Sequence, residues 1–442
     1  MASAYLERTK STPTNQYKWT WSGWVKLSDI SNAGGGGNQL LYNDYTDTSN
    51  RATIYFESND TLVVVDRVSN VNVLNYTPTR LFRDSNAWYH IVVSHDRTLA
   101  SPETKIYING VQETSFSTST NPSQNGTTYF NQSGQTTYIG KYGGGAEYYD
   151  GYMAHVHFID GTIYQASDFG QFNSDGVWTP KLSPSVTYGT NGFFLKFNEG
   201  ALGTDSSPNG NNFTVNGSLT ASKDTPENIY ATLNPLLDVY VAGTYLNGNT
   251  AFTGNGSTNF AGCSIPVSSG KWYAEVKTAT VNSSYPILGV IDSQSYRRRN
   301  DTYFVASDVN TANPSGFAVF SNGDIYHNNS NTYGNLGTTY TSGDIIGLAL
   351  DMDSVTKTLG FYKNGTLQTT INLDEPPSSS YIFAMSISPS TSSAKAEWNF
   401  GNGFFGTTAV ASAGSNGNGS IFEYDVPTGY YALNTQNLAT YG

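Results

Sequence analysis

Four tyrosines surround a run of glycines in the first half of the chain, and aromatic residues in such a loop could bind sugars. They are Tyr142, Tyr148, Tyr149 and Tyr152, and the glycines occupy positions 143–145. A tyrosine ring offers a flat apolar face that can stack on a sugar ring, and its hydroxyl can form a hydrogen bond. The alternative is that each ring is half-buried on a sheet face with its hydroxyl in water. We interpret the four tyrosines together as a candidate carbohydrate-binding site at a loop rim.

Other side chains with chemical potential are scattered along the chain. On a strand, His155 and His157 would share one face and could bind a metal ion. No cysteine or carboxylate at a suitable spacing completes such a site, so two structural histidines are the favoured interpretation. None of the five histidines accompanies a Gly-x-Ser-x-Gly motif, which argues against a serine nucleophile. Asp351 and Asp353 place two carboxylates on one strand face without a glutamate partner. None of these groups predicts a catalytic site.

The charge of the chain argues against one large class of partner. Its 442 residues carry 22 Lys and Arg against 34 Asp and Glu, a formal net charge of −12. Neutralising phosphate groups requires a basic surface, so nucleic acid is not expected as a ligand. The one basic run, Arg297, Arg298 and Arg299, is interpreted as a solvated loop, with an interaction surface as the alternative.

Cysteine usage and hydropathy indicate where such a chain is made. Cys263 is the one cysteine, so the sequence predicts neither a disulfide framework nor a cysteine-based metal site. No apolar stretch approaches the roughly 20 residues that cross a bilayer, so membrane insertion is not expected. Residues 1–8 lack the apolar core of a secretory signal. We therefore expect synthesis and folding in a cytosol.

Composition predicts an all-β fold that would position these side chains. Aromatic residues make up 14% of the chain and charged residues 13%, with 45 glycines among many Ser, Thr and Asn. Aromatic and β-branched residues suit pleated sheets, and polar turn residues suit hairpins. Asn109-Gly110 and Asn364-Gly365 each follow a strand-like segment and predict type I′ hairpin turns. Short strands recur without long helical patterns between them, so we predict two antiparallel sandwiches in tandem.

The halves of the chain repeat this pattern on either side of a polar segment. We predict a first domain at residues 1–217, a linker at 218–228 and a second domain at 229–442. Trp88 and Trp272 each begin an apolar-alternating strand and are predicted to be core anchors. The segment after residue 400 carries many aromatic residues, so we expect it to add a strand to its own domain or to dock on a neighbouring subunit.

Several segments resemble known families. The first half resembles a laminin G or pentraxin-like domain, a concanavalin-A-like jelly roll, in residues 21–25, 88–93, 105–110, 138–140 and 151–160. The second half is similar to a SPRY domain, also a concanavalin-like sandwich, in residues 270–276, 343–351 and 360–365. SPRY domains are usually protein-interaction modules, so the resemblance implies binding through protein surfaces. The predicted fold is therefore two tandem antiparallel concanavalin-A-like jelly-roll sandwiches.

The first resemblance implies two further kinds of site. Laminin G-like domains often hold Ca²⁺ at a sandwich rim through aspartate oxygens. Asp150, Asp160 and Asp175 lie near predicted strand ends and are the calcium candidates here, with turn-forming aspartates as the alternative. Jelly-roll glucanases carry a Glu-x-Asp-x-x-Glu type run that supplies their two carboxylates. This chain has no such run, and we expect no enzymatic activity.

A third resemblance implies a setting. Residues 169–178, 192–216 and 421–430 resemble structural proteins of marine tailed bacteriophages. This implies a virion protein assembled in the host cytoplasm, part of a capsid decoration, tail fibre or appendage, with other virion proteins as partners and a homo-oligomeric state. A host-surface glycan-binding adhesin is the alternative function, and a polysaccharide depolymerase is disfavoured by the missing carboxylate pair.

Overall fold

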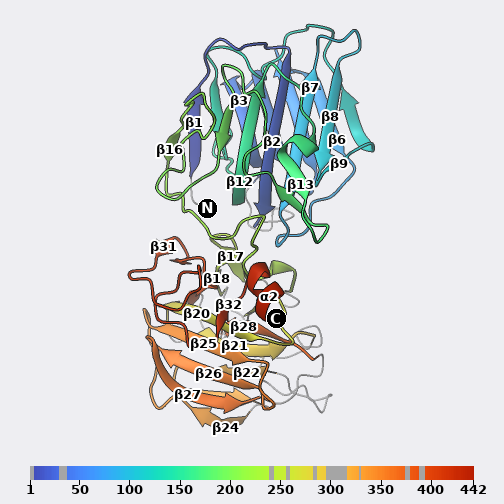
Figure 1. Ribbon diagram of the computed structural model, residues 1–442. Helices are drawn as coiled ribbons and strands as arrows, with labels where there is room; N and C mark the ends of the chain where they lie inside the picture. The colour runs from blue at the N-terminus through green and yellow to red at the C-terminus, as the bar shows by residue number, and fades with distance from the viewer. Residues whose placement is uncertain are drawn as a thin grey trace. The chain divides into compact units, whose positions relative to one another are not determined.

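The chain folds into two compact units, residues 1–221 and residues 222–442 (Figure 1). The computed structural model describes residues 4–28, 37–237, 243–254, 259–281, 286–294, 316–327, 330–373, 379–387 and 394–442. The junction between the units falls inside the segment 218–228 that the sequence predicts as a linker. Each unit consists mainly of antiparallel strands, so the predicted all-β fold class is confirmed.

The first unit is a sandwich of two antiparallel sheets. The larger has eight strands in the order β10-β6-β5-β4-β3-β11-β1-β16. Its strands are β1 (Tyr5–Thr9), β3 (Gln39–Asp47), β4 (Asn50–Phe56), β5 (Leu62–Val68), β6 (Val71–Pro78), β10 (Phe116–Thr120), β11 (Thr136–Ile139) and β16 (Thr214–Asn216). The smaller has six strands in the order β15-β12-β2-β7-β8-β9. They are β2 (Lys18–Leu27), β7 (Tyr89–Asp96), β8 (Glu103–Ile108), β9 (Val111–Gln112), β12 (Gly151–Asp160) and β15 (Phe193–Leu195).

Alternate side chains of these strands meet between the sheets and form the core of the first unit. In β4, Ala52, Ile54 and Phe56 are buried in the same apolar cluster as Trp19 and Trp21 of β2. Successive side chains of a strand point to opposite faces, so the remaining side chains of β4 point away from this core. The alternation therefore fixes which residues the larger sheet presents on its outer face.

A separate layer covers the outer face of the smaller sheet. It contains α1 (Ala166–Phe169), β13 (Gly170–Phe172) and β14 (Trp178–Pro180). Val92 and Ile159 of the sheet pack there against Ala166 and Phe169 in a second apolar cluster. The smaller sheet is thus covered by apolar contacts on both of its faces.

The second unit has the same two-sheet plan. One sheet has the order β17-β18-β29-β20-β25-β26-β27, with β32 also paired to β20, and the other has the order β19-β28-β21-β22-β23-β24. The first contains β17 (Thr244–Leu246), β18 (Ala251–Thr253), β20 (Lys271–Thr280), β25 (Ile345–Asp351), β26 (Thr358–Lys363), β27 (Thr366–Asn372), β29 (Lys395–Asn399) and β32 (Tyr431–Ala432). The second contains β19 (Asn259–Gly262), β21 (Pro286–Asp292), β22 (Gly316–Val319), β23 (Asp324–His327), β24 (Ser330–Asn335) and β28 (Tyr381–Ile387).

Short elements complete the second unit. They are η1 (Pro235–Leu237), the small hairpin of β30 (Phe404–Phe405) and β31 (Thr408–Ala409), and α2 (Thr435–Tyr441). No helix among the described residues is both long and apolar enough to cross a membrane.

The two Asn-Gly turns have the predicted backbone. Asn109 and Gly110 have φ angles of 49° and 84°, and Asn364 and Gly365 have φ angles of 47° and 78°. Positive φ at both central residues is the signature of a type I′ turn, which matches the twist of paired strands. The first turn joins β8 to β9 and the second joins β26 to β27, so both hairpin predictions are confirmed.

The C-terminal segment folds onto its own unit, the first of the two predicted alternatives. β32 pairs in parallel with β20, with Tyr431 opposite Trp272. In the same region, Phe422 packs with Tyr273 at a ring-centroid distance of 5.1 Å. The buried Glu275 carboxylate of β20 accepts the backbone N–H groups of Glu423 and Tyr424 at 2.8 and 2.9 Å. A strand pairing, ring contacts and a buried carboxylate together hold the segment in place.

Trp88 and Trp272 are both buried, with 7% and 0% of their surfaces exposed, as predicted for core anchors. Trp272→Ala should lower the free energy of unfolding by about 3–5 kcal/mol, because truncating a core aromatic leaves a cavity. Urea unfolding of the full chain measures this change. Val355→Ala, at a side chain that is 99% exposed, is the control and should cost less than about 0.5 kcal/mol. Equal costs for the two variants would contradict the assigned core.

Glu275 should make the stability of the protein depend on pH. Burial raises its pKa from 4.5 to about 7, although the N–H groups of Glu423 and Tyr424 oppose that shift. The folded protein therefore keeps this proton in a range where the unfolded chain has lost it, so the contribution to stability falls as pH rises from about 4.5 to 7. Glu275→Gln should remove this part of the slope, at most about 1.4 kcal/mol per pH unit.

Urea unfolding at several pH values between 4.5 and 8 tests this expectation. The stability difference between the wild-type chain and Glu275→Gln should change across the window. The same substitution at the exposed Glu199 should leave the pH profile unaltered. Parallel profiles for wild type and Glu275→Gln would show that the carboxyl does not hold its proton in the folded state.

Candidate functional site

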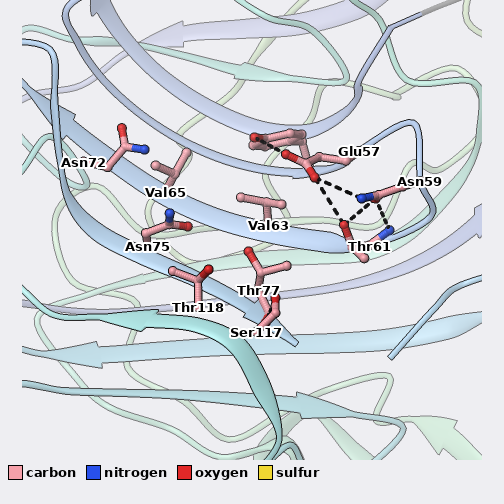
Figure 2. Close-up of a pocket in the computed structure, with 11 residues that line it drawn as sticks. Glu57, Asn59, Thr61, Val63, Val65, Asn72, Asn75, Thr77, Ser117 and Thr118 are labelled. Carbon is pink, nitrogen blue, oxygen red and sulfur yellow. Dashed lines mark hydrogen bonds between the residues drawn. The ribbon is translucent and has the colours of Figure 1, made fainter. Parts of the chain in front are cut away.

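The outer face of the eight-stranded sheet of the first unit carries a groove of about 320 Å³. It crosses β4, β5, β6 and β10, near the edge of the sheet (Figure 2). Its lining is mainly polar and consists of Tyr55, Glu57, Asn59, Thr61, Val63, Val65, Asn72, Asn75, Thr77, Ser117 and Thr118. Ligand sites typically measure about 300–1,000 Å³ and are mostly apolar, so this groove has the size of a small ligand site but a more polar lining than is usual. We take it as the candidate site because a polar hollow of this size suits a ligand with many hydroxyl groups.

Strand alternation and register place the groove residues. Tyr55 lies between the core residues Ile54 and Phe56, so its ring stands on the opposite face of β4. In the sheet register, Tyr55 is opposite Val63 of β5. One step along β5, Val65 is opposite Asn75 of β6. The two valines thus form an apolar floor between an aromatic wall and an amide wall.

Hydrogen bonds organise one end of the groove. The Tyr55 hydroxyl donates to Glu57 Oε1 at 3.5 Å, and Asn59 Nδ2 donates to Glu57 Oε2 at 3.4 Å. Thr61 Oγ1 lies 2.6 Å from Asn59 Oδ1 and 3.4 Å from Glu57 Oε2. Figure 2 shows Glu57, Asn59 and Thr61 joined at this end. Burial, with the Glu57 carboxylate as a smaller cause, raises the pKa of Tyr55 to about 12, so its hydroxyl remains a donor at neutral pH.

The opposite wall has one polar atom without a partner among the described residues. Oδ1 of Asn75 is buried and accepts no hydrogen bond from the described residues. A buried amide oxygen without a donor typically costs about 1–3 kcal/mol. Thr77, Thr118 and the exposed Asn72 lie beside it. This wall can therefore supply amide and hydroxyl groups to a ligand with many hydroxyls.

Two of the four predicted tyrosines lie near this face of the sheet. Tyr142 packs edge-on against Tyr45 of β3 at a centroid distance of 5.6 Å, and Tyr148 lies 6.3 Å from Tyr5 of β1. The glycine run lets the loop that carries these tyrosines pack closely against the Tyr45 ring. A Cβ at Gly143 would lie 2.5 Å from the Tyr45 ring, so the loop could not lie flat there with a larger residue.

The other two tyrosines have different surroundings. The Tyr149 hydroxyl donates to the backbone carbonyls of Lys26 and Tyr152 at 2.9 and 3.2 Å, and its ring packs on the core. Tyr152 belongs to β12 of the smaller sheet and contacts the Trp88 ring edge-on at 6.2 Å. The four tyrosines are therefore divided between the two sheets, and none of them lines the groove.

The three calcium candidates lie in separate environments. Asp160 is buried and accepts the backbone N–H groups of Thr14, Asn15 and Asn191 and the Asn131 amide, at 2.7–3.1 Å. Its oxygens thus face hydrogen-bond donors, which repel a cation. Asp175 is exposed in the turn between β13 and β14, and Asp150 follows the loop that carries the tyrosines. Within the described ranges, no group of three or more His, Cys, Asp or Glu side chains could hold a metal ion.

The remaining candidates serve local structure or lie outside the described residues. His157 stacks on Phe194 at a centroid distance of 3.9 Å and shares a 3.0 Å hydrogen bond with Tyr188. His155 also contacts Phe194, at 5.7 Å.

The carboxylates at the end of β25 hold a turn. Asp351 pairs with Lys271 at 2.7 Å, and Asp353 accepts the Gly270 N–H at 2.6 Å. The run Arg297, Arg298 and Arg299 lies outside the described residues.

The groove contains a single carboxylate among its lining residues, Glu57. Glycoside hydrolysis by the common mechanisms needs two carboxyl groups on either side of the scissile bond. The lining residues therefore do not supply the carboxylate pair that these common mechanisms use.

The sequence contained a signal for this groove. Arg51, Thr53, Tyr55 and Glu57 alternate with the apolar residues 52, 54 and 56, which indicates a strand with one polar, partly aromatic face. What the sequence did not indicate is that β10 would pair with β6 and complete the groove, because strand neighbours that are far apart in the chain depend on the fold.

Comparison with known proteins agrees with the architecture. Residues 2–167 match the model of the Concanavalin A-like lectin/glucanases superfamily. No curated protein matches the chain.

Three solved structures are among those similar to parts of the chain. The SPRY domain of human HERC1 is 20% identical, covers 38% of this chain and 96% of its own length, and has a TM-score of 0.31. The heptameric SAP-like pentraxin of Limulus polyphemus is 17% identical, covers 37% and 72%, and has a TM-score of 0.28. A candidate carbohydrate-binding protein of Bacteroides ovatus is 18% identical, covers 48% and 58%, and has a TM-score of 0.33. These likenesses carry no argument about function.

The family match and the sheet order of the first unit lead to one conclusion about the part of the chain that holds the groove. Its fold is that of a concanavalin-A-like jelly roll.

Proposed function

We propose that this protein binds glycans without cleaving them, and that the groove on β4, β5, β6 and β10 is the binding site. The observation that carries the proposal is the groove itself, a hollow of about 320 Å³ on the outer face of a lectin-like sheet. Its lining joins an apolar floor and a tyrosine ring to several amide and hydroxyl groups. Sugars present the same combination, with C–H faces and a rim of hydroxyls.

The arrangement assigns a role to each wall. Tyr55 presents an aromatic ring beside the floor of Val63 and Val65, where the apolar face of a sugar ring can lie. Glu57 accepts hydrogen bonds from sugar hydroxyls at one end. Asn75 supplies an amide whose oxygen has no donor in the folded protein, so a small rotation of that side chain would let a ligand hydroxyl satisfy it.

Tyr55→Ala and Asn75→Ala should each weaken glycan binding by roughly tenfold or more, which corresponds to about 1.4 kcal/mol. A glycan array identifies a ligand for the wild-type chain, and calorimetry then compares the variants. Gln112→Ala, at an exposed position of β9 in the other sheet, is the control and should bind as wild type does.

Thermal melts of each variant separate loss of binding from loss of folding. If both groove variants are folded and bind the glycan as tightly as wild type does, the binding site lies outside the groove. An array without any saturable ligand would refute the glycan-binding function.

We further propose that this binding serves a tailed bacteriophage particle, as a capsid decoration or a tail fibre or appendage component. The support is the resemblance of residues 169–178, 192–216 and 421–430 to phage structural proteins. Other virion proteins and further copies of this chain would be its partners, and a host-surface glycan would be its ligand.

Labelling the C-terminus of this chain on purified particles tests the virion proposal by electron microscopy. Label at a regular position on the particle is the expected result. Particles that lack the label while the protein accumulates in the infected cell would contradict a virion role, and they would leave the glycan proposal standing.

A further inference from the structure

Two arginines face each other on the same outer sheet surface as the groove. Arg51 of β4 and Arg67 of β5 are directly opposite in the sheet register. Both are partly exposed, and they alternate with the inward-facing Ala52 and Asp66. The Arg51 guanidinium lies over the Tyr142 ring, 5.4 Å from its centroid, and donates to the Thr48 carbonyl. This places two positive charges side by side on a chain whose net charge is −12.

The described residues give this pair no direct ion-pair partner. Neither guanidinium forms an ion pair with a carboxylate of the described residues, whereas Arg80 and Arg83 in the same unit pair with Glu113 and Asp60. In addition, Nε of Arg67 is buried and has no acceptor among the described residues.

The carboxylates around the arginine pair have other partners. Asp47 accepts the Ser49 N–H at 2.7 Å and the Asn50 amide at 3.0 Å. Glu147, on the loop beside Tyr142, is 3.5 Å from Asn38 Nδ2. Like charges directly opposite each other in a sheet are destabilising. An anion bound between the two guanidinium groups would remove that repulsion.

The arginine pair continues the groove. Arg67 is opposite Asn72 of β6, which lines the groove at the end away from Glu57. On β4, Arg51 and Tyr55 lie on one face four residues apart, a separation of about 13–14 Å along the strand. A ligand of a few sugar units could therefore contact Tyr55 and reach the arginines.

We propose that the groove selects glycans with an anionic substituent, a carboxylate or a sulfate, and that Arg51 and Arg67 bind that substituent. This inference rests on the proposed glycan-binding function. Arginine suits the task because its planar guanidinium donates paired hydrogen bonds to carboxylate and sulfate oxygens. In this arrangement the groove binds the sugar rings, and the arginine pair binds the charged substituent.

The test is a glycan array that holds matched neutral, carboxylated and sulfated glycans, followed by calorimetry on the glycans that bind. Wild type should bind at least one anionic glycan tenfold or more tightly than its neutral counterpart, and the carboxylated and sulfated arms show which substituent is preferred. The double variant Arg51→Gln/Arg67→Gln should lose that preference. Raising NaCl from 50 to 500 mM should weaken the anionic glycan more than the neutral one.

Two further variants make the result specific. Lys181→Gln/Lys196→Gln removes the same number of charges outside the eight-stranded sheet and should leave the preference intact. Arg51→Lys/Arg67→Lys keeps both positive charges, so this variant should retain part of the preference for the anionic glycan that the glutamine variant loses. Thermal melts confirm that each variant is folded.

The possible outcomes distinguish failure of this inference from failure of the proposed glycan-binding function. The inference would be overturned if wild type bound neutral and anionic glycans equally well and the arginine substitutions had no effect. That result would leave the glycan-binding function intact. Equal losses in the arginine and lysine variants would show general charge attraction and would also overturn the inference. Equally tight binding of a DNA oligonucleotide would do the same. If the wild-type chain binds no glycan of any class, the proposed function itself fails.

Discussion

The face-to-face packing of two sheets is the constraint on which the first unit depends. Each strand must give every second side chain to the core, and Ile54, Phe56 and Val64 do so in β4 and β5. The intervening side chains then have to lie on the other face, whatever their chemistry. Tyr55, Val63 and Val65 form part of a groove for that reason, and Arg51 and Arg67 meet beyond it. One packing requirement thus sets both the core and the candidate site.

The sheets differ in what covers them. The outer face of the six-stranded sheet carries its own apolar layer, where Phe169 and Tyr188 pack. In the second unit, the C-terminal segment does the same for β20 and β25, through Phe422 and Val426. The groove-bearing face of the eight-stranded sheet is polar, and the loop with Gly143 lies on Tyr45 and Tyr138 beside it. A ligand can bind to a sheet face that is not covered and that carries hydrogen-bonding groups. Because apolar layers cover the other faces named here, the groove-bearing face is the better candidate for ligand binding.

Buried carboxylates tie loops to the sheets in both units. Asp66 accepts the backbone N–H groups of Tyr129 and Phe130, and Glu275 accepts those of Glu423 and Tyr424. Asp160 has the same role for the segment around Thr14. An aspartate at a strand end therefore has two very different uses, as a ligand of a cation or as an acceptor for backbone N–H groups. The difference lies in what surrounds the carboxylate, which is a property of the fold.

The sequence by itself determined the all-β class, the two Asn-Gly hairpins and the burial of Trp88 and Trp272, because alternation and turn chemistry are local. It also contained the polar face of β4, since Arg51 and Tyr55 alternate with apolar residues. Only the tertiary structure paired β10 with β6, divided the four tyrosines between two sheets and surrounded Asp160 with N–H donors. Those outcomes depend on which strands become neighbours and which loops return to them. Such contacts join residues far apart in the chain, and no local pattern encodes them.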